Sequence, residues 1–247
     1  MTTETNKKTS TSEQNEPVKN PEKSRIKIQT EEYCEKYKNV SAIDVNPQVK
    51  RLQTIVRKSD SCLPENKTAN RSDFVFAADR LIRLVVEFGL DMLPVQAKDV
   101  TTPGNHIFNG TQWTQSSCGV SIVRSGEAME HGLRDCCRSI RIGKILIQTD
   151  DETGKAQVYY SKFPPQINNR IILLMYPILN YGSTISEAVE VLKNHGVECS
   201  QVILLTLFAS PTGVDLLSKK YPDMRILTTE ISSTLPTHFS TKYFGTQ

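Results

Sequence analysis

Apolar residues along this chain follow two alternating patterns. Short apolar runs, typical of strands buried in a sheet, occur at Cys118–Val123, Ile171–Met175, Val202–Phe208 and Arg225–Thr229. Between them, apolar residues recur every three or four positions, which predicts helices at Phe74–Leu93, Glu127–Arg138 and Pro211–Tyr221. This alternation predicts an α/β fold with a mostly parallel central sheet flanked by helices. The ligand crevice of such a fold lies at the carboxyl ends of its strands.

The stretch from Ile171 to His195 reads as strand, loop and helix in direct succession. In the helix that follows the loop, Thr184 and Glu187 fit a capping box, and Gly196 stands at the expected end. Free N–H groups at such a helix start, together with the helix dipole, can bind a phosphate. The same pattern also fits an ordinary loop that binds nothing, because no glycine-rich dinucleotide or P-loop motif is present.

Polar segments divide the rest of the chain. Thr101–Trp113 carries turn residues and predicts a hairpin or loop. Two β-like segments, Lys144–Gln148 and Gln157–Lys162, flank a polar insert, which predicts a mobile β-arm. The first residues are almost free of large apolar side chains, so we expect them to be disordered. The predicted organisation is a low-complexity tail and arm over residues 1–48, followed by one domain over residues 49–247.

The charge balance argues against nucleic-acid binding. The 247 residues include 30 basic and 27 acidic ones, a net charge of +3, which gives no bulk attraction for a polyanion. A basic stripe could form from Arg134, Arg138, Arg141 and Lys144. Neighbouring carboxylates dilute it, and no aromatic stacking platform is interleaved with it, so a solvated helix face is the preferred interpretation.

Location and redox state follow from what the chain lacks. No apolar run approaches the ~20 residues that a membrane helix needs, and the N-terminus has no apolar signal region. We therefore expect a cytoplasmic protein, with the nucleus as a second location, and no membrane partner. The six cysteines show no metal-ligand spacing, so we expect free thiols and no metal site built by them.

Several separate blocks of the chain resemble one enzyme family. The blocks are CGVSIVRSGEAMEHGLRDCCRSIRIGKILIQTDDET, YYSKFPPQI, ILLMYPILNYGST and the terminal KYFGT. They resemble the uracil phosphoribosyltransferases, and most closely the animal homologues of that family. The resemblance implies the type I phosphoribosyltransferase fold. It also implies transfer of a phosphoribosyl group from phosphoribosyl pyrophosphate (PRPP) to uracil, with Mg²⁺, to give UMP.

The resemblance also implies positions for the ligand. Arg124-Ser125-Gly126 stands where the family holds pyrophosphate, and Tyr181-Gly182-Ser183-Thr184 stands at the loop for the 5′-phosphate. Lys144 and the acidic insert Asp150-Asp151-Glu152 resemble the flexible arm that closes over PRPP. Homo-oligomers, dimers or tetramers, and GTP as an effector are further expectations from the family. An alternative for Arg124 is an ion pair with the nearby Glu127 or Glu130.

Other positions depart from the family pattern. Tyr176 stands where an aspartate normally grips the ribose hydroxyls, and Thr149 stands where the arm commonly has an arginine. The uracil loop lacks the usual glycines and reads Pro236, Thr237, His238 and Phe239 at its centre. His238 could act as an acid or base, although a solvated histidine is the more common case.

These departures leave two hypotheses. The preferred one is a family member that keeps the fold and binds a phosphate or nucleotide such as PRPP or UMP, with doubtful transfer chemistry. The alternative is an active uracil phosphoribosyltransferase that works with a modified site. No catalytic residue is assigned in either case.

Overall fold

The computed structural model describes residues 21–58, 71–149 and 156–246. Within these residues, seven strands form the main sheet in the order β1-β11-β9-β7-β4-β5-β6. All neighbouring pairs are parallel except β5 with β6. The strands are β1 (Val40–Ala42), β4 (Ser117–Val123), β5 (Arg141–Thr149), β6 (Ala156–Lys162), β7 (Ile171–Met175), β9 (Val202–Leu205) and β11 (Arg225–Thr228). The predicted mostly parallel sheet is confirmed.

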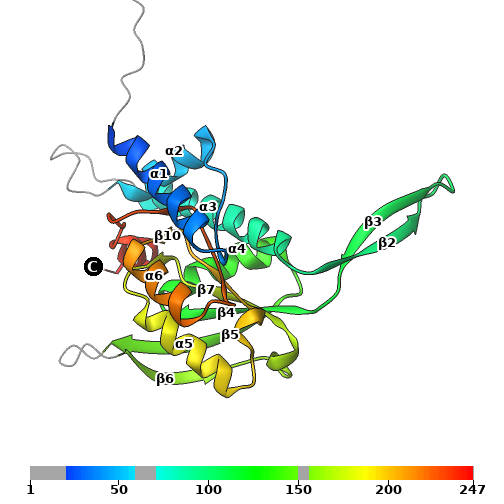
Figure 1. The fold of residues 1–247 in the computed structure, drawn as a ribbon. Helices are drawn as coiled ribbons and strands as arrows, with labels where there is room; N and C mark the ends of the chain where they lie inside the picture. The colour runs from blue at the N-terminus through cyan, green and yellow to red at the C-terminus, as the bar shows by residue number, and fades with distance from the viewer. Residues whose placement is uncertain (1–20, 59–70, 150–155, 247) are drawn as a thin grey trace, which may run out of the picture.

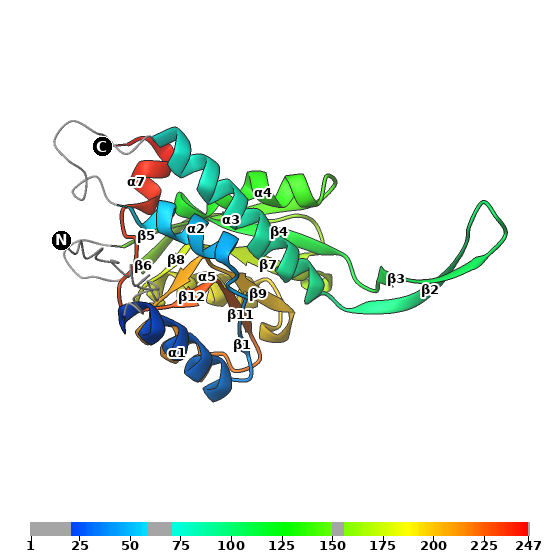
Figure 2. The same ribbon diagram turned by 90° about the horizontal axis from the view of Figure 1, so that it is seen from above.

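Helices cover both faces of this sheet, as Figure 2 shows. One face carries α2 (Pro47–Arg57), α3 (Arg71–Asp91), α4 (Ala128–Cys136) and the short α7 (Phe239–Phe244). The other carries α5 (Ser183–Asn194), α6 (Pro211–Lys220) and α1 (Pro21–Lys36). The amphipathic spacing read from the sequence accounts for this layering, because each helix turns its apolar positions toward the sheet. None of the described helices is long and apolar enough to span a membrane.

The direction of the connections reverses between β7 and β4. From β4 the chain passes through α4 to β5 on one side, whereas from β7 it passes through α5 to β9 on the other. The carboxyl ends of β4 and β7 lie side by side, with Ser121 in register with Met175. In open α/β sheets, such a switch point opens a crevice for ligands.

A second, small sheet continues three of the parallel strands beyond this edge. It consists of β12 (Glu230–Ile231), β10 (Phe208–Ala209) and β8 (Ile178–Leu179). The predicted continuous strand Val202–Phe208 is therefore wrong, since it is interrupted after Leu205. At this interruption, the Thr206 hydroxyl donates to the Pro177 carbonyl at 3.1 Å.

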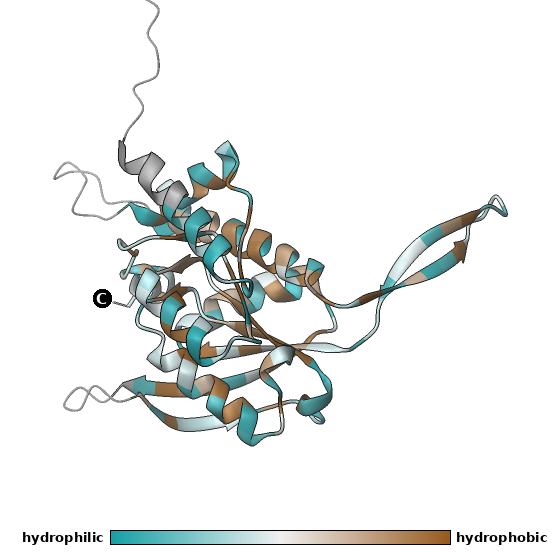
Figure 3. Cartoon of the chain, viewed as in Figure 1, coloured by the Kyte–Doolittle hydropathy of each residue, from teal (hydrophilic) through white to brown (hydrophobic). Residues whose placement is uncertain are grey.

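A long hairpin projects from the body of the molecule (Figure 1). It consists of β2 (Val95–Thr101) and β3 (Ile107–Trp113), so the hairpin predicted at Thr101–Trp113 is confirmed and begins earlier. Apolar side chains on it are exposed, Ile107 and Phe108 among them, and Figure 3 shows brown stretches both here and on the central strands. The two segments predicted as β-like form strands β5 and β6, which belong to the main sheet. The polar insert between them, residues 150–155, lies outside the described part.

The segment before residue 49 contributes to the core. Strand β1 pairs with β11, with Val40 opposite Ile226, and α1 packs beside β12. The Thr30 hydroxyl accepts a hydrogen bond from the Ile231 N–H at 2.9 Å. The predicted boundary near residue 48 stays a prediction, and residues 1–20 lie outside the described part.

Candidate functional site at the carboxyl edge of the sheet

The turn after β4 brings one predicted anion site to the switch point. Arg124 follows β4 across a cis peptide bond from Val123, and Ser125–Glu127 form a single 3₁₀ turn before α4. Gly126 is buried, and a Cβ atom there would lie 2.4 Å from the carbonyl oxygen of Met175. Only a residue without a side chain can approach the end of β7 so closely. Glycine at this position therefore lets the turn pack against the strand that leads to Tyr176.

The side chain of Arg124 has neutral partners. It is exposed, its guanidinium lies 5.0 Å from the centre of the Phe244 ring, and it donates to the hydroxyl of Thr246. The alternative that Arg124 is ion-paired with Glu127 or Glu130 is wrong among the described contacts, because Lys144 binds both of these carboxylates. Among the described contacts, no carboxylate therefore neutralises Arg124 at the switch point.

Lys144 lies on β5, and two carboxylates balance its charge. Its ammonium donates to Glu127 at 2.6 Å and lies 3.3 Å from Glu130, which also accepts from the Ser121 hydroxyl at 2.6 Å. The hydrogen bond to Glu127, followed by Glu130, raises the pKa of Lys144. Lys144 lies on β5, which pairs with the terminal strand β6 of the sheet, and its membership of a flexible arm stays a prediction. Its predicted partners Asp150, Asp151 and Glu152 lie outside the described residues.

The loop after β7 forms a hollow of about 320 Å³ at the start of α5. Its lining runs from Tyr176 through Asn180, Tyr181, Gly182, Ser183 and Thr184 to Ile185. Gly182 has φ +84°, and no side chain caps the N-terminus of α5. The predicted capping box of Thr184 and Glu187 is wrong, because the N-cap is Gly182 and the helix begins two residues earlier than predicted. The uncapped N–H groups face the loop that was predicted to bind phosphate, which favours an anion there.

Tyr176 forms one wall of this hollow. Thr184 lines the same hollow, and burial raises the pKa of the Tyr176 phenol above its ordinary value. The phenol is therefore neutral at physiological pH, and no negative charge stands at the position where the family resemblance implies a carboxylate.

The predicted uracil loop is packed onto α2 and α3. Pro236 and Phe239 are buried, and Thr237 is exposed. His238 is half-buried, and its Nε2 donates to the Val56 carbonyl at 3.2 Å. The expectation of a solvated histidine is therefore wrong. An acid–base role for His238 gains no support from this contact, which ties the loop to α2.

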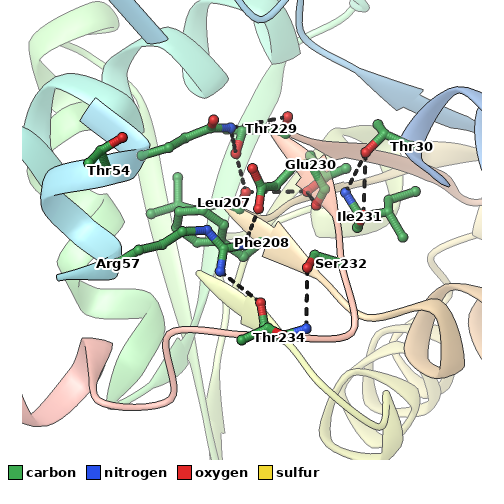
Figure 4. A network of polar contacts seen from close by, with 12 residues as sticks. Thr30, Thr54, Arg57, Leu207, Phe208, Thr229, Glu230, Ile231, Ser232 and Thr234 are labelled. Carbon is green, nitrogen blue, oxygen red and sulfur yellow. Dashed lines mark hydrogen bonds and ion pairs between the residues drawn. The ribbon is translucent and has the colours of Figure 1, made fainter. Parts of the chain in front are cut away.

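Two residues that the sequence did not single out hold the start of this loop. Arg57 forms an ion pair with the buried carboxylate of Glu230 and donates to the Thr234 carbonyl at 2.7 Å (Figure 4). Its guanidinium also lies 4.8 Å from the centre of the Phe208 ring. The sequence signal that could have indicated Glu230 is its acidic side chain within the short strand β12. Its partner lies 173 positions away, so the pair could not be read from spacing.

Comparison with known proteins agrees with this geometry. A sequence profile of the family described as uracil phosphoribosyltransferase matches residues 43–242. A Danio rerio protein named uracil phosphoribosyltransferase homolog is 56% identical over 83% of this chain and 76% of its own length. A Dictyostelium discoideum protein named uracil phosphoribosyltransferase is 42% identical over 85% of this chain and 97% of its own length.

A solved structure shares the fold at low identity. The AQ2163 protein from Aquifex aeolicus superimposes with a TM-score of 0.68 and 17% identity, over 84% of this chain and 99% of that chain. At this identity the likeness concerns the fold alone.

Proposed function

Because the chain belongs to the uracil phosphoribosyltransferase family, we propose that its switch-point crevice binds the phosphates of PRPP or of a nucleotide such as UMP. In this proposal, transfer of the phosphoribosyl group to uracil is slow or absent. The observation that carries the proposal is the position of Tyr176, a half-buried neutral phenol at the end of β7 in the lining of the hollow.

The two anion sites are supported by complementary donors. At the β4 turn, a guanidinium with neutral partners offers hydrogen bonds that match the oxygens of a pyrophosphate. At the start of α5, uncapped N–H groups and the positive end of the helix dipole favour a 5′-phosphate. Because both sites lie beyond the adjacent ends of β4 and β7, one ligand with phosphates at its two ends fits the arrangement.

The site lacks a carboxylate that would bind the hydroxyls of the ribose between these phosphates, and efficient transfer needs such a group. A carboxylate that accepts from two ribose hydroxyls contributes roughly 1.5–3 kcal/mol per hydrogen bond. Loss of both bonds corresponds to about two to four decades in affinity or rate. A neutral Tyr176 offers at most one such bond, and without a negative charge. It also leaves uncompensated the positive charge that develops on the ribose ring.

Further expectations from the family belong to this proposal. Among the described residues, no group of three or more His, Cys, Asp and Glu side chains could hold a metal ion. In this proposal, Mg²⁺ enters with the oxygens of PRPP. Regulation by GTP and assembly into dimers or tetramers are part of the proposal, as is a cytoplasmic and nuclear location.

An active uracil phosphoribosyltransferase is the second candidate. It is favoured by the retained order of Arg124 and the Gly182-Ser183-Thr184 loop around one crevice. The sequence of the loop at Pro236–Phe239 argues against an active enzyme. It lacks the glycines of the family pattern, which would let the backbone approach a flat base.

Two measurements separate these functions. In calorimetry, purified protein is titrated separately with PRPP plus Mg²⁺, uracil, UMP and GTP. We expect heat of binding for PRPP or UMP and little for uracil alone. In parallel, formation of radiolabelled UMP from uracil and PRPP is followed. Rapid turnover contradicts the proposal and selects the active enzyme, whereas absence of binding by both PRPP and UMP rejects a working crevice of either kind.

A further inference from the structure

The C-terminal helix α7 is fixed to the helices beside the β4 turn. Arg71 on α3 donates from Nε to the Lys242 carbonyl at 3.1 Å and from Nη2 to the Tyr243 carbonyl at 2.7 Å. The Tyr243 hydroxyl donates to Asp79 at 2.7 Å. These bonds hold the backbone and one side chain of α7 at a defined place relative to α3.

A series of ring contacts then sets the orientation of Phe244. Phe239 is fully buried against Phe74, at 5.7 Å between ring centres. The ring of Tyr243 stacks on Phe239 with 16° between their planes, and Phe244 meets Tyr243 edge-on at 5.2 Å. The Phe244 ring is therefore supported from the core outward and presents a face to the guanidinium of Arg124.

The chain turns back immediately after this ring. Gly245 ends α7 with φ +68°, a conformation that residues with side chains rarely adopt. The turn brings the hydroxyl of Thr246 to the guanidinium of Arg124, which donates to it. Within the described residues, no carboxylate forms an ion pair with Arg124, whereas Lys144 nearby is neutralised by two.

We propose that Phe244 and Thr246 are positioning residues for Arg124, and that they orient its guanidinium toward the pyrophosphate of the donor without reducing its charge. This inference rests on the proposed function of the crevice. An aromatic face and a hydroxyl attract a guanidinium but carry no net charge, so the cation stays available for phosphate. Thr246 engages one of the five N–H donors of Arg124 and leaves the others for phosphate oxygens. Because the side chain is already ordered, little of its rotational freedom is lost on binding.

The test measures binding of pyrophosphate plus Mg²⁺ and of PRPP plus Mg²⁺ by calorimetry. Phe244→Leu removes the ring face and is expected to weaken pyrophosphate binding about two- to fivefold, whereas the matched control Phe244→Tyr keeps it. Thr246→Val is expected to weaken binding, and Thr246→Ser to retain it. In an Arg124→Ala background, Phe244→Leu is expected to have no further effect. Losses that persist in that background overturn the inference, because they would reflect a structural role only.

A spectroscopic readout separates this inference from the proposed function. The ¹H–¹⁵N signal of the Arg124 side chain, assigned by its disappearance in Arg124→Lys, should carry a ring-current shift from Phe244. Phe244→Leu is expected to remove that shift, and Thr246→Val to leave it while increasing side-chain mobility. An unchanged signal in Phe244→Leu overturns the positioning role even if PRPP binds. Absence of all ligand binding in the wild type rejects the proposed function, while the signal still decides whether Phe244 orders Arg124.

Discussion

The side chains of Tyr176 and Thr184 are neighbours in the lining of the hollow at the start of α5. Tyr176 follows the central strand β7, and Thr184 lies in the first turn of the helix that the strand leads to. One hollow therefore links the position expected to grip a ribose with the loop expected to hold its 5′-phosphate. The phenol is neutral, because burial raises its pKa.

Tyr176→Asp is expected to strengthen PRPP binding or to raise the rate of UMP formation by about two to four decades. The carboxylate would accept from both ribose hydroxyls. Calorimetry with PRPP and the radiolabelled uracil assay measure the two effects. Tyr176→Asn is the matched control, because it has a similar shape and no charge. Equal behaviour of the two variants would show that negative charge at this position is not the missing element.

The ion pair of Arg57 with Glu230 is expected to dominate the stability of the loop after β12. Glu230→Leu leaves the guanidinium beside a buried apolar residue and should lower the free energy of unfolding by about 3 kcal/mol. Urea denaturation measures this difference. The double variant Arg57→Met with Glu230→Leu should recover most of the loss, because neither charge then remains unpaired. Additive losses in the double variant would contradict the interpretation.

Gly126→Ala tests the close approach of the β4 turn to β7. A Cβ atom there would lie 2.4 Å from the Met175 carbonyl oxygen, so backbone must shift. We expect a loss of about 1–3 kcal/mol in the free energy of unfolding, together with weaker pyrophosphate binding. Gly104→Ala is the control, since its Cβ would meet only the side chain of His106, at 3.2 Å. Similar stability of the two variants in urea denaturation would argue against a packing requirement at residue 126.

Elements whose residues form a clear apolar pattern were predictable from the sequence. Strand β7 was predicted with the bounds Ile171–Met175 that the structure has, because a run buried on both faces has no polar positions to blur its ends. The hydroxyl pattern at Thr184 misled the prediction of a capping box, since Gly182 in a left-handed conformation starts the helix earlier. At the break after Leu205, the hydroxyl of Thr206 is bonded to the carbonyl of Pro177, a long-range contact that periodicity cannot show.

The residues of the candidate site were found through resemblance, whereas their partners were not. The positions of Arg124 and Tyr176 could be aligned by motif, and both lie at the switch point. The partners of Arg124 are Phe244 and Thr246. They are distant in sequence, with Thr246 122 positions away, and reach Arg124 only through the packing of α7. Likewise, several acidic residues lie near Lys144 in the sequence. The pairing of β5 with β4 in the sheet places Lys144 beside Glu127 and Glu130, and the sequence alone does not show this.

The buried thiol of Cys118 on β4 should make stability decrease at alkaline pH. Burial raises its pKa to about 11, from an ordinary value of 9.0. A raised pKa means that the folded state keeps the proton longer than the unfolded chain, so this contribution is complete below pH 9 and is lost as pH rises toward 11. A shift of two units corresponds to about 3 kcal/mol at about 1.4 kcal/mol per unit. Urea denaturation between pH 7.5 and 10.5 measures it, with Cys118→Ala as the control that lacks the titrating group. If the wild type and Cys118→Ala lose stability in parallel over this range, Cys118 does not contribute to the alkaline sensitivity.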